Sequence, residues 1–109
     1  MHLRGVCGLL IAMLVLSALA AQSQSADQRR ISYGRHLAQE CTACHRIDGT
    51  DNGIPSIVGQ DPVYFTETMG YYRSGARTNQ VMVSVAQSLD EAQVAALAAY
   101  YASLPKRKK

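Results

Sequence analysis

Apolar residues along the chain form one continuous run and then several stripes with helical spacing. The run occupies residues 6–16, and after it Ile31, Gly34, Leu37 and Ala38 recur every three or four positions. A stripe with this period is one face of an α-helix. We therefore predict a first amphipathic helix over residues 27–40, which leads directly into Cys41.

A second helix is predicted over residues 62–74, after an irregular connection. The connection, residues 46–60, contains three glycines and a proline, which is too many turn formers for a regular helix. Asp61 then supplies an N-cap and Pro62 a first-position proline, while Gly75 supplies the stop. These signals predict a loop followed by a helix.

Two further helices follow in the pattern. A short helical stretch is predicted at residues 81–87, and the last helix is expected to begin at a capping box in which Ser88 is the N-cap and Glu91 its partner. The apolar stripe of that helix is formed by Val94, Leu97, Ala98 and Tyr101, and Pro105 ends it. Strand-like alternation is absent from the sequence, so we predict an all-α fold with three main helices and one or two short ones.

The first twenty residues have the pattern of an export signal. Arg4 is the charged residue before the apolar run, and Ala18-Leu19-Ala20 is a small-residue cleavage site. A retained membrane anchor is the alternative, but the uncharged stretch at residues 6–21 has 16 residues, whereas a spanning helix needs roughly 20. We expect a signal peptide at 1–20, a flexible leader at 21–26, a folded domain at 27–105 and a basic tail at 106–109, with no stable membrane span.

Composition narrows the possible functions further. With 109 residues, no Trp and one Phe, a single small domain has little apolar volume for a core of its own. The net charge of +3 falls to +2 after cleavage, because Arg4 is the one charged residue in the signal. Nucleic-acid binding is not expected at this charge, and the basic tail is too short to indicate it.

The candidate chemistry lies in the segment Cys41-Thr42-Ala43-Cys44-His45. Its C-x-x-C-H spacing is the attachment signature of haem c. Two thiols three residues apart reach the two vinyl groups on one edge of the porphyrin, and the following histidine reaches the iron. The sequence therefore predicts one covalent haem c bound by Cys41 and Cys44, with His45 as an iron ligand and as a donor to some acceptor through its other ring nitrogen.

Two other readings of the motif are open. A thioredoxin-like redox pair has the same C-x-x-C spacing, but it belongs to a βαβ pattern that the sequence lacks. A zinc site would have to use the two thiols with His36 and His45, a set that is too clustered for a closed tetrahedral site. Cys7 lies inside the apolar run and is expected to leave with the signal.

Residues from about Ile31 to Pro105 resemble the class I cytochromes c. The segments that carry the resemblance are Gly34-x-x-Leu37-Ala38-x-x-Cys41, Leu97 with Tyr100, Ile54-Pro55-Ser56-Ile57-x-Gly59-Gln60, and Tyr71-Tyr72-Arg73-Ser74-Gly75-Ala76-Arg77. The resemblance implies the class I cytochrome c fold, in which the first and last helices cross at Gly34. The same part of the chain also resembles single domains of periplasmic diheme cytochromes c. Residues 54–82 in addition resemble the cytochrome subunit of flavocytochrome c sulfide dehydrogenase. This chain has one haem motif where the diheme forms have two.

The same resemblance implies roles for residues outside the motif. The carbonyl of Pro55 is expected to accept the proton of His45. Tyr64 and Arg77 are expected to hydrogen-bond the haem propionates, against the alternatives of a helix-surface tyrosine and a solvated arginine.

Two methionines remain after the signal, Met69 and Met82. Met69 lies inside the predicted second helix in register with Phe65 and Tyr72, where packing is the expected role. Met82 follows a flexible connection, residues 75–80, and its distance from Pro55 fits the family's spacing. We therefore predict that Met82 is the second iron ligand.

The predicted function is periplasmic electron transfer by a soluble carrier rather than catalysis, because histidine and methionine together fill both axial positions. The alternatives are a catalytic haem protein with an open position, a thiol or metal module, and an electron-accepting cytochrome subunit of a flavocytochrome c sulfide dehydrogenase-like complex. The expected partners are redox proteins, such as a flavoprotein sulfide dehydrogenase or a terminal oxidase.

Overall fold

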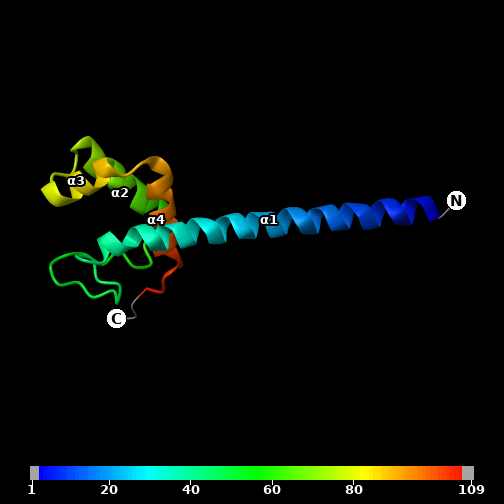
Figure 1. Cartoon of the computed structure of the whole chain (residues 1–109), viewed down its shortest axis with the longest axis horizontal. Helices are drawn as coiled ribbons and strands as arrows, with labels where there is room; N and C mark the ends of the chain where they lie inside the picture. The colour runs from blue at the N-terminus through cyan, green and yellow to red at the C-terminus, as the bar shows by residue number, and fades with distance from the viewer. Residues whose placement is uncertain (1–2, 107–109) are drawn as a thin grey trace.

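The computed structural model describes residues 3–106, which form four helices and no strand. The helices are α1 (Leu3–Cys41), α2 (Pro62–Ser74), α3 (Gln80–Ser88) and α4 (Glu91–Ser103). Figure 1 shows α2, α3 and α4 gathered around the C-terminal end of α1. The predicted all-α fold, with three longer helices and a short one, is confirmed.

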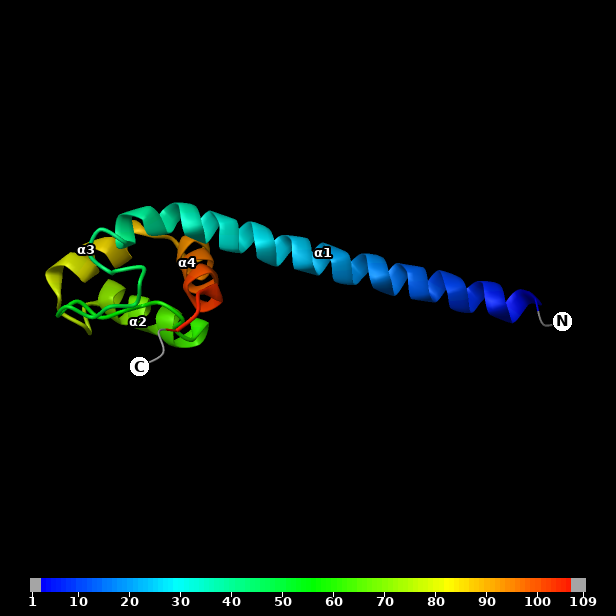
Figure 2. The ribbon, with the colours of Figure 1, turned by 90° about the horizontal axis from the view of Figure 1, so that it is seen from below.

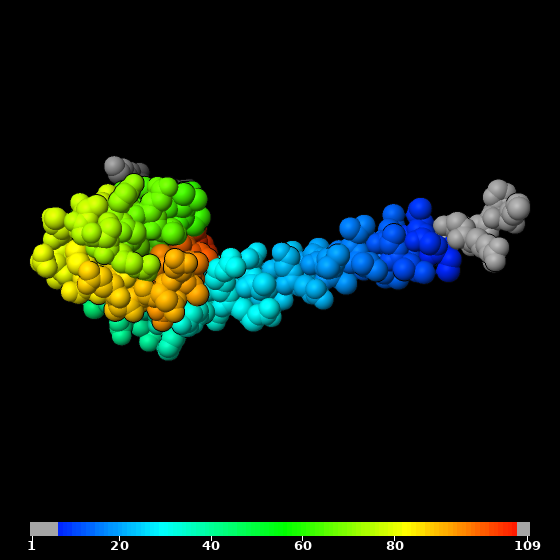
Figure 3. All heavy atoms as spheres, turned by 90° about the horizontal axis from the view of Figure 1, so that it is seen from above, coloured from blue at the N-terminus to red at the C-terminus, as the bar shows by residue number. Residues whose placement is uncertain are grey.

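Helix α1 is far longer than the sequence pattern predicts. It continues without interruption through residues 21–26, where we expected a flexible leader, and projects from the domain in Figures 1 and 2. No Gly or Pro occurs between Gly8 and Gly34 to break the helix, so α1 can continue through these residues. Residues 7–30 are exposed along their whole length, as Figure 3 illustrates.

The N-terminal part of α1 is long and apolar enough to cross a membrane by length and composition. The candidate region is Cys7–Cys41, with a mean hydropathy of 1.7 in its most apolar window and no burial of that window. An export signal has the same properties. The cleaved signal and the domain boundaries therefore stay predictions.

The folded part is centred on the crossing of α1 and α4. A Cβ atom built on Gly34 would collide with the carbonyl of Ala96 and lie 2.7 Å from Cβ of Tyr100. Hydrogen is therefore the only side chain that allows these two backbones to approach so closely. The predicted crossing at Gly34 and its contact with Tyr100 are confirmed, but Ala96 rather than the expected Leu97 faces the glycine.

Helix α2 begins and ends where the sequence predicts. The Asp61 carboxylate accepts hydrogen bonds from the backbone N–H groups of Val63 and Tyr64, both at 3.0 Å. Gly75 adopts a φ of 81°, which suits glycine, and its N–H donates to the carbonyl of Tyr72. Local chemistry at the two ends thus sets the length of α2.

The start of α4 differs from the prediction. Its N-cap is Asp90, whose carboxylate accepts from the N–H of Gln93 at 2.7 Å, while Oε1 of Gln93 accepts from the N–H of Asp90 at 2.9 Å. Ser88 is instead the last residue of α3, and its hydroxyl donates to the carbonyl of Val85. The expected Ser88–Glu91 box is wrong because a competing Asp–Gln box lies two residues further along the chain.

The core of the domain is small and is formed mainly by α4. Leu97 and Tyr101 are almost completely buried, and the Tyr101 ring stacks against Phe65 of α2 at a centroid distance of 5.8 Å. The remaining buried apolar residues are Ala38, Met69, Ala86, Val94, Ala96, Ala98 and Tyr100. Most of these side chains are small, so the protein core by itself removes little apolar surface from water.

Candidate functional site

A cavity of about 470 Å³ opens beside this core. Its walls are formed by the end of α1, the loop at residues 53–60, α2 and α3, and α4 contributes Leu97. The lining is mainly apolar and includes Leu37, Ile57, Phe65 and Val85. The volume lies within the range of roughly 300–1,000 Å³ that is typical of cofactor sites.

The C-x-x-C-H motif lies at the end of α1 and turns into this cavity. The N–H groups of Cys44 and His45 both donate to the carbonyl of Cys41, at 3.2 and 2.8 Å, so the helical turn continues past the last residue of α1. Cys41, Cys44 and His45 all line the cavity, and both thiols are free. The structure therefore brings the three predicted residues to one edge of one cavity.

The imidazole of His45 is buried, with 8% of its surface exposed, and it is fixed by one hydrogen bond. Its Nδ1 lies 2.7 Å from the carbonyl oxygen of Pro55. A carbonyl can only accept, so Nδ1 carries the proton and donates. This leaves the Nε2 lone pair free for a metal, as the resemblance implied for His45 and Pro55.

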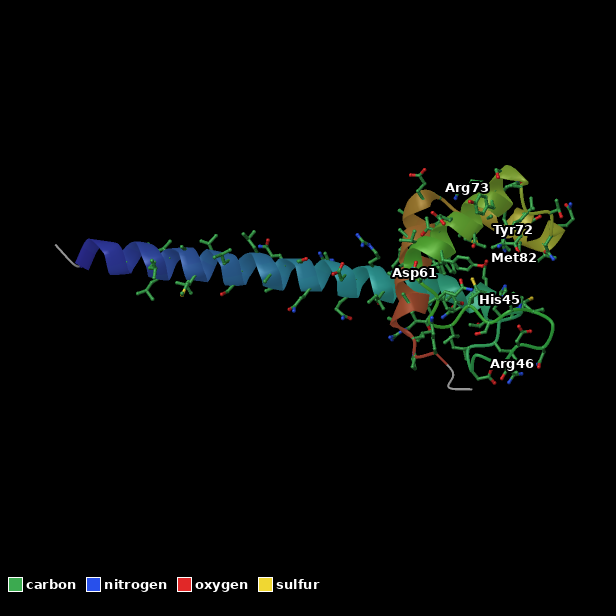
Figure 4. The ribbon with its side chains drawn as sticks, turned by 180° about the vertical axis from the view of Figure 1, so that it is seen from behind. His45, Arg46, Asp61, Tyr72, Arg73 and Met82 are labelled. Atoms are coloured by element: carbon green, nitrogen blue, oxygen red, sulfur yellow. The ribbon has the colours of Figure 1, made fainter. Side chains whose placement is uncertain are left out.

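Both candidate methionines line the cavity, from different helices. Met69 lies on α2 and is buried in the core cluster with Phe65. Met82 is half-buried in the first turn of α3, and its N–H donates to the side-chain oxygen of the N-cap Asn79 at 3.1 Å. Figure 4 shows Met82 and His45 in the same part of the domain, on separate segments.

Tyr64, Tyr72 and Arg77 all line the cavity. The Arg77 guanidinium lies over the Tyr72 ring at 5.5 Å from its centroid. The hydroxyls of Tyr72 and, to a smaller extent, Tyr64 raise the pKa of Arg77. The structure thus brings the two residues predicted to bind propionates to one cavity and adds Tyr72, for which no such role was predicted.

A buried hydroxyl lies beside the attachment motif. The Tyr101 side chain is fully buried, and its oxygen has no hydrogen-bond partner among residues 3–106. Burial, and then the neighbouring Cys41, raises the pKa of Tyr101. Burial also raises the pKa of the Cys41 thiol, which therefore stays protonated at neutral pH.

Arg73 is a residue that sequence reasoning did not single out. It lies on α2, and its Nε and Nη2 donate to the backbone carbonyls of Ala86 and Leu89 at 3.3 and 2.6 Å. These carbonyls belong to the C-terminal end of α3, 13 and 16 residues away in sequence. No local sequence signal marks this contact.

The donor set fits a covalently bound haem. Two free thiols and one imidazole line the same apolar cavity as a thioether, and the imidazole already has the tautomer that metal ligation needs. Within the described residues, no group of three or more His, Cys, Asp or Glu side chains is placed to hold a metal ion. The zinc alternative therefore has no site there.

Comparison with known proteins agrees with this donor set. The family model described as cytochrome c matches residues 31–105. The thiosulfate dehydrogenase electron acceptor of Thiomonas intermedia is 41% identical over 70 residues, which cover 62% of this chain and 32% of that protein. Cytochrome c-554(548) of Halomonas halodenitrificans is 35% identical over 68 residues, which cover 58% of this chain and 82% of that protein.

A third relative extends the match toward the N-terminus. Cytochrome c4 of Pseudomonas aeruginosa is 30% identical over 97 residues, which cover 87% of this chain and 47% of that protein. The chain thus spans about half of this relative and a third of the Thiomonas protein. These matches confirm the predicted class and its covalent haem c. The predicted link to a flavocytochrome subunit gains no support from them.

Proposed function

The chain belongs to the cytochrome c family, and we propose that it carries single electrons between redox partners outside the cytoplasm through one covalently attached haem c. The proposal rests on one observation: a single apolar cavity is lined by Cys41, Cys44, His45 and Met82. When bound there, the haem supplies an iron that cycles between the ferrous and ferric states.

In this proposal each residue has a separate role. Cys41 and Cys44 would hold the haem through two thioether bonds, and His45, oriented by the carbonyl of Pro55, would bind its iron. Met82, from the first turn of α3, would bind the iron as the second ligand. Histidine with methionine raises the reduction potential and leaves no axial position for a substrate, which favours a carrier over an enzyme.

Tyr64 and Arg77 are proposed to hydrogen-bond the propionates. Their position at the cavity wall supports this role, because a guanidinium forms strong charge-assisted hydrogen bonds with carboxylates. Tyr72 keeps the guanidinium in place through its ring.

The test of the axial ligands compares Met82→Ala with Met69→Ala. The ferric protein is expected to show the weak far-red absorption that reports iron–thioether bonding, and Met82→Ala should abolish it while Met69→Ala retains it. The reverse result would assign the ligand to Met69. A pyridine haemochrome assay after acid-acetone extraction checks the covalent attachment independently, since haem that is extracted would contradict both thioether bonds.

A specific observation bears on the partner. Two relatives, from Thiomonas intermedia and Stutzerimonas stutzeri, are named electron acceptors of thiosulfate dehydrogenase. We therefore propose a periplasmic dehydrogenase as donor and a soluble shuttle as the form of the protein, with a subunit of a flavoprotein sulfide dehydrogenase as the second candidate. Purification from a native extract separates them, because a stable flavoprotein companion would contradict the shuttle.

Catalysis at the iron is the remaining alternative. An enzyme of the peroxidase kind needs an open or labile sixth position, so its ferric form would be high-spin and would bind cyanide rapidly. The proposed carrier should be low-spin and should bind cyanide slowly. A single ferric spectrum with a cyanide time course therefore distinguishes the two functions.

A further inference from the structure

The side chain of Arg73 links helix α2 to the C-terminal end of helix α3. Its side chain is half-buried on α2 and reaches across to the carbonyls of Ala86 and Leu89, at 3.3 and 2.6 Å. Carbonyls at the C-terminal end of a helix have no partner within the helix and carry its partial negative charge. A guanidinium is well matched to them, because it is always charged and donates in two directions at once.

Helix α3 has few other means of staying in place. It has nine residues, a length at which an isolated helix is unstable in water. Ala86 is its one buried residue, and among the described helices its close backbone contacts are with α2 alone. Arg73 supplies the polar part of that contact.

The Arg73 hydrogen bonds and the proposed ligand Met82 lie on the same helix, α3, about one turn apart. Met82 and Ala86 are four residues apart and therefore share one face of α3. Ala86 is buried on that face, and Val85, beside it, lines the same cavity as Met82. A displacement of the C-terminal end of α3 away from α2 would therefore move Met82 with it.

We propose that Arg73 is a positioning residue for the Met82 ligand, and that its two hydrogen bonds determine how often Met82 leaves the iron. The proposal rests on the proposed function, in which Met82 is the second axial ligand. Arg73 is not among the residues that line the cavity. Its effect passes through the backbone of α3.

The experiment measures cyanide binding to the ferric holoprotein. Cyanide binds only when the sixth position is vacant, so its limiting rate at high concentration reports the opening of Met82. Arg73→Met retains a long apolar side chain but removes every donor, and Arg73→Lys retains the charge with donors that cannot form the same fork. Asp61→Ala is the matched control, because it weakens the other end of the same helix α2 and is remote from α3 in Figure 4.

The limiting rate should rise about tenfold or more in Arg73→Met, since hydrogen bonds from a charged donor are the strong ones. It should rise less in Arg73→Lys. Asp61→Ala should lower the denaturation midpoint and leave the limiting rate unchanged, because global stability and local opening are separate quantities. The far-red band should persist in all three variants.

Two outcomes would overturn the proposal. An unchanged limiting rate in both Arg73 variants would show that Arg73 does not control the opening of Met82. A comparable acceleration in Asp61→Ala would show that the rate follows global stability. Failure of the proposed function is distinguishable, because the unsubstituted protein would then lack the far-red band and bind cyanide rapidly.

Discussion

The two walls of the cavity carry the two proposed iron ligands on supports of very different strength. His45 follows the part of α1 that crosses α4 at Gly34, where Ala96 and Tyr100 leave no space for a side chain. Met82 lies on α3, which has nine residues and one buried side chain. We call the C-terminal end of α1 with His45 the His45 wall, and α3 with Met82 the Met82 wall.

Under the proposed ligation, this difference would let one small domain combine a permanent ligand with an exchangeable one. On the His45 wall, covalent attachment, a buried imidazole and a helix crossing all restrain the same few residues. On the Met82 wall, restraint comes from Asn79 at one end of α3 and Arg73 at the other. Local opening is expected where buried apolar contacts are few, so it should begin at the Met82 wall.

The largest effect is expected when the haem that joins the two walls is removed. Cys41→Ala with Cys44→Ala should leave a largely unfolded apoprotein, because the cavity of about 470 Å³ would expose its apolar lining and the remaining core is small. Helical circular dichroism of the haem-free protein measures this. Native-like helicity in the double variant would contradict the prediction.

The next effect tests the His45 wall. Gly34→Val should destabilise the protein by about 3 kcal/mol, because the colliding atoms belong to the backbone of Ala96 and cannot rotate away. Denaturant unfolding of the holoprotein measures the change. Gly70→Ala is the matched control in α2, where a Cβ meets nothing within 4 Å, and it should increase stability by about 0.5–1 kcal/mol. Equal denaturation midpoints for Gly34→Val and the unsubstituted protein would show that Gly34 is not needed where α1 and α4 cross.

A smaller effect is expected at the Met82 wall. Asn79→Ala removes the oxygen that caps the N–H of Met82, at a cost of about 1 kcal/mol to α3. The far-red band should therefore disappear at a lower denaturant concentration than in the unsubstituted protein, while the global helical signal shifts less. Coincident shifts of the two signals would mean that α3 does not open separately.

The smallest effect concerns the exposed ion pair of Arg46 and Asp48, which follows His45 in the sequence. The Arg46 guanidinium, and then the N–H of Thr50, hold the pKa of Asp48 well below its usual range. A carboxyl with a lowered folded pKa contributes stability above its unfolded value of about 4, and that contribution is lost as the pH falls toward the folded value. Because both side chains are about half exposed to water, the contribution is small.

The measurement for this pair is an NMR titration of the Asp48 carboxyl. Arg46→Gln should raise the pKa of Asp48 toward its usual value and should leave the far-red band unchanged, since the pair belongs to neither wall. An identical titration curve in Arg46→Gln would show that Arg46 does not hold the carboxylate.

Local chemistry was sufficient to predict several elements from the sequence. The bounds of α2 follow from Asp61, Pro62 and Gly75, each of which acts within three residues of itself. The C-x-x-C-H spacing likewise acts within one turn, so the edge that Cys41, Cys44 and His45 share was predictable. Pro55 and Gly34 required the family resemblance, because nothing near either residue in sequence indicates its partner.

Where local signals compete, the sequence alone misleads. Ser88 and Asp90 both begin plausible capping boxes, and the structure uses Asp90 because its carboxylate and the Gln93 amide satisfy each other. The polar residues at 21–26 suggest a leader, yet they contain no helix breaker, and α1 passes through them. Propensity and composition differ too little at these positions to decide between the outcomes.

The sequence by itself determined the bounds of α2, the attachment motif and the candidate ligands, since each depends on spacing along the chain. The tertiary structure alone decided that Arg73 holds the end of α3 and that the Tyr101 hydroxyl is buried beside Cys41. Both contacts join residues far apart in sequence that only folding brings together. Their energies depend on burial and on the direction of backbone groups, and neither exists before the helices have packed.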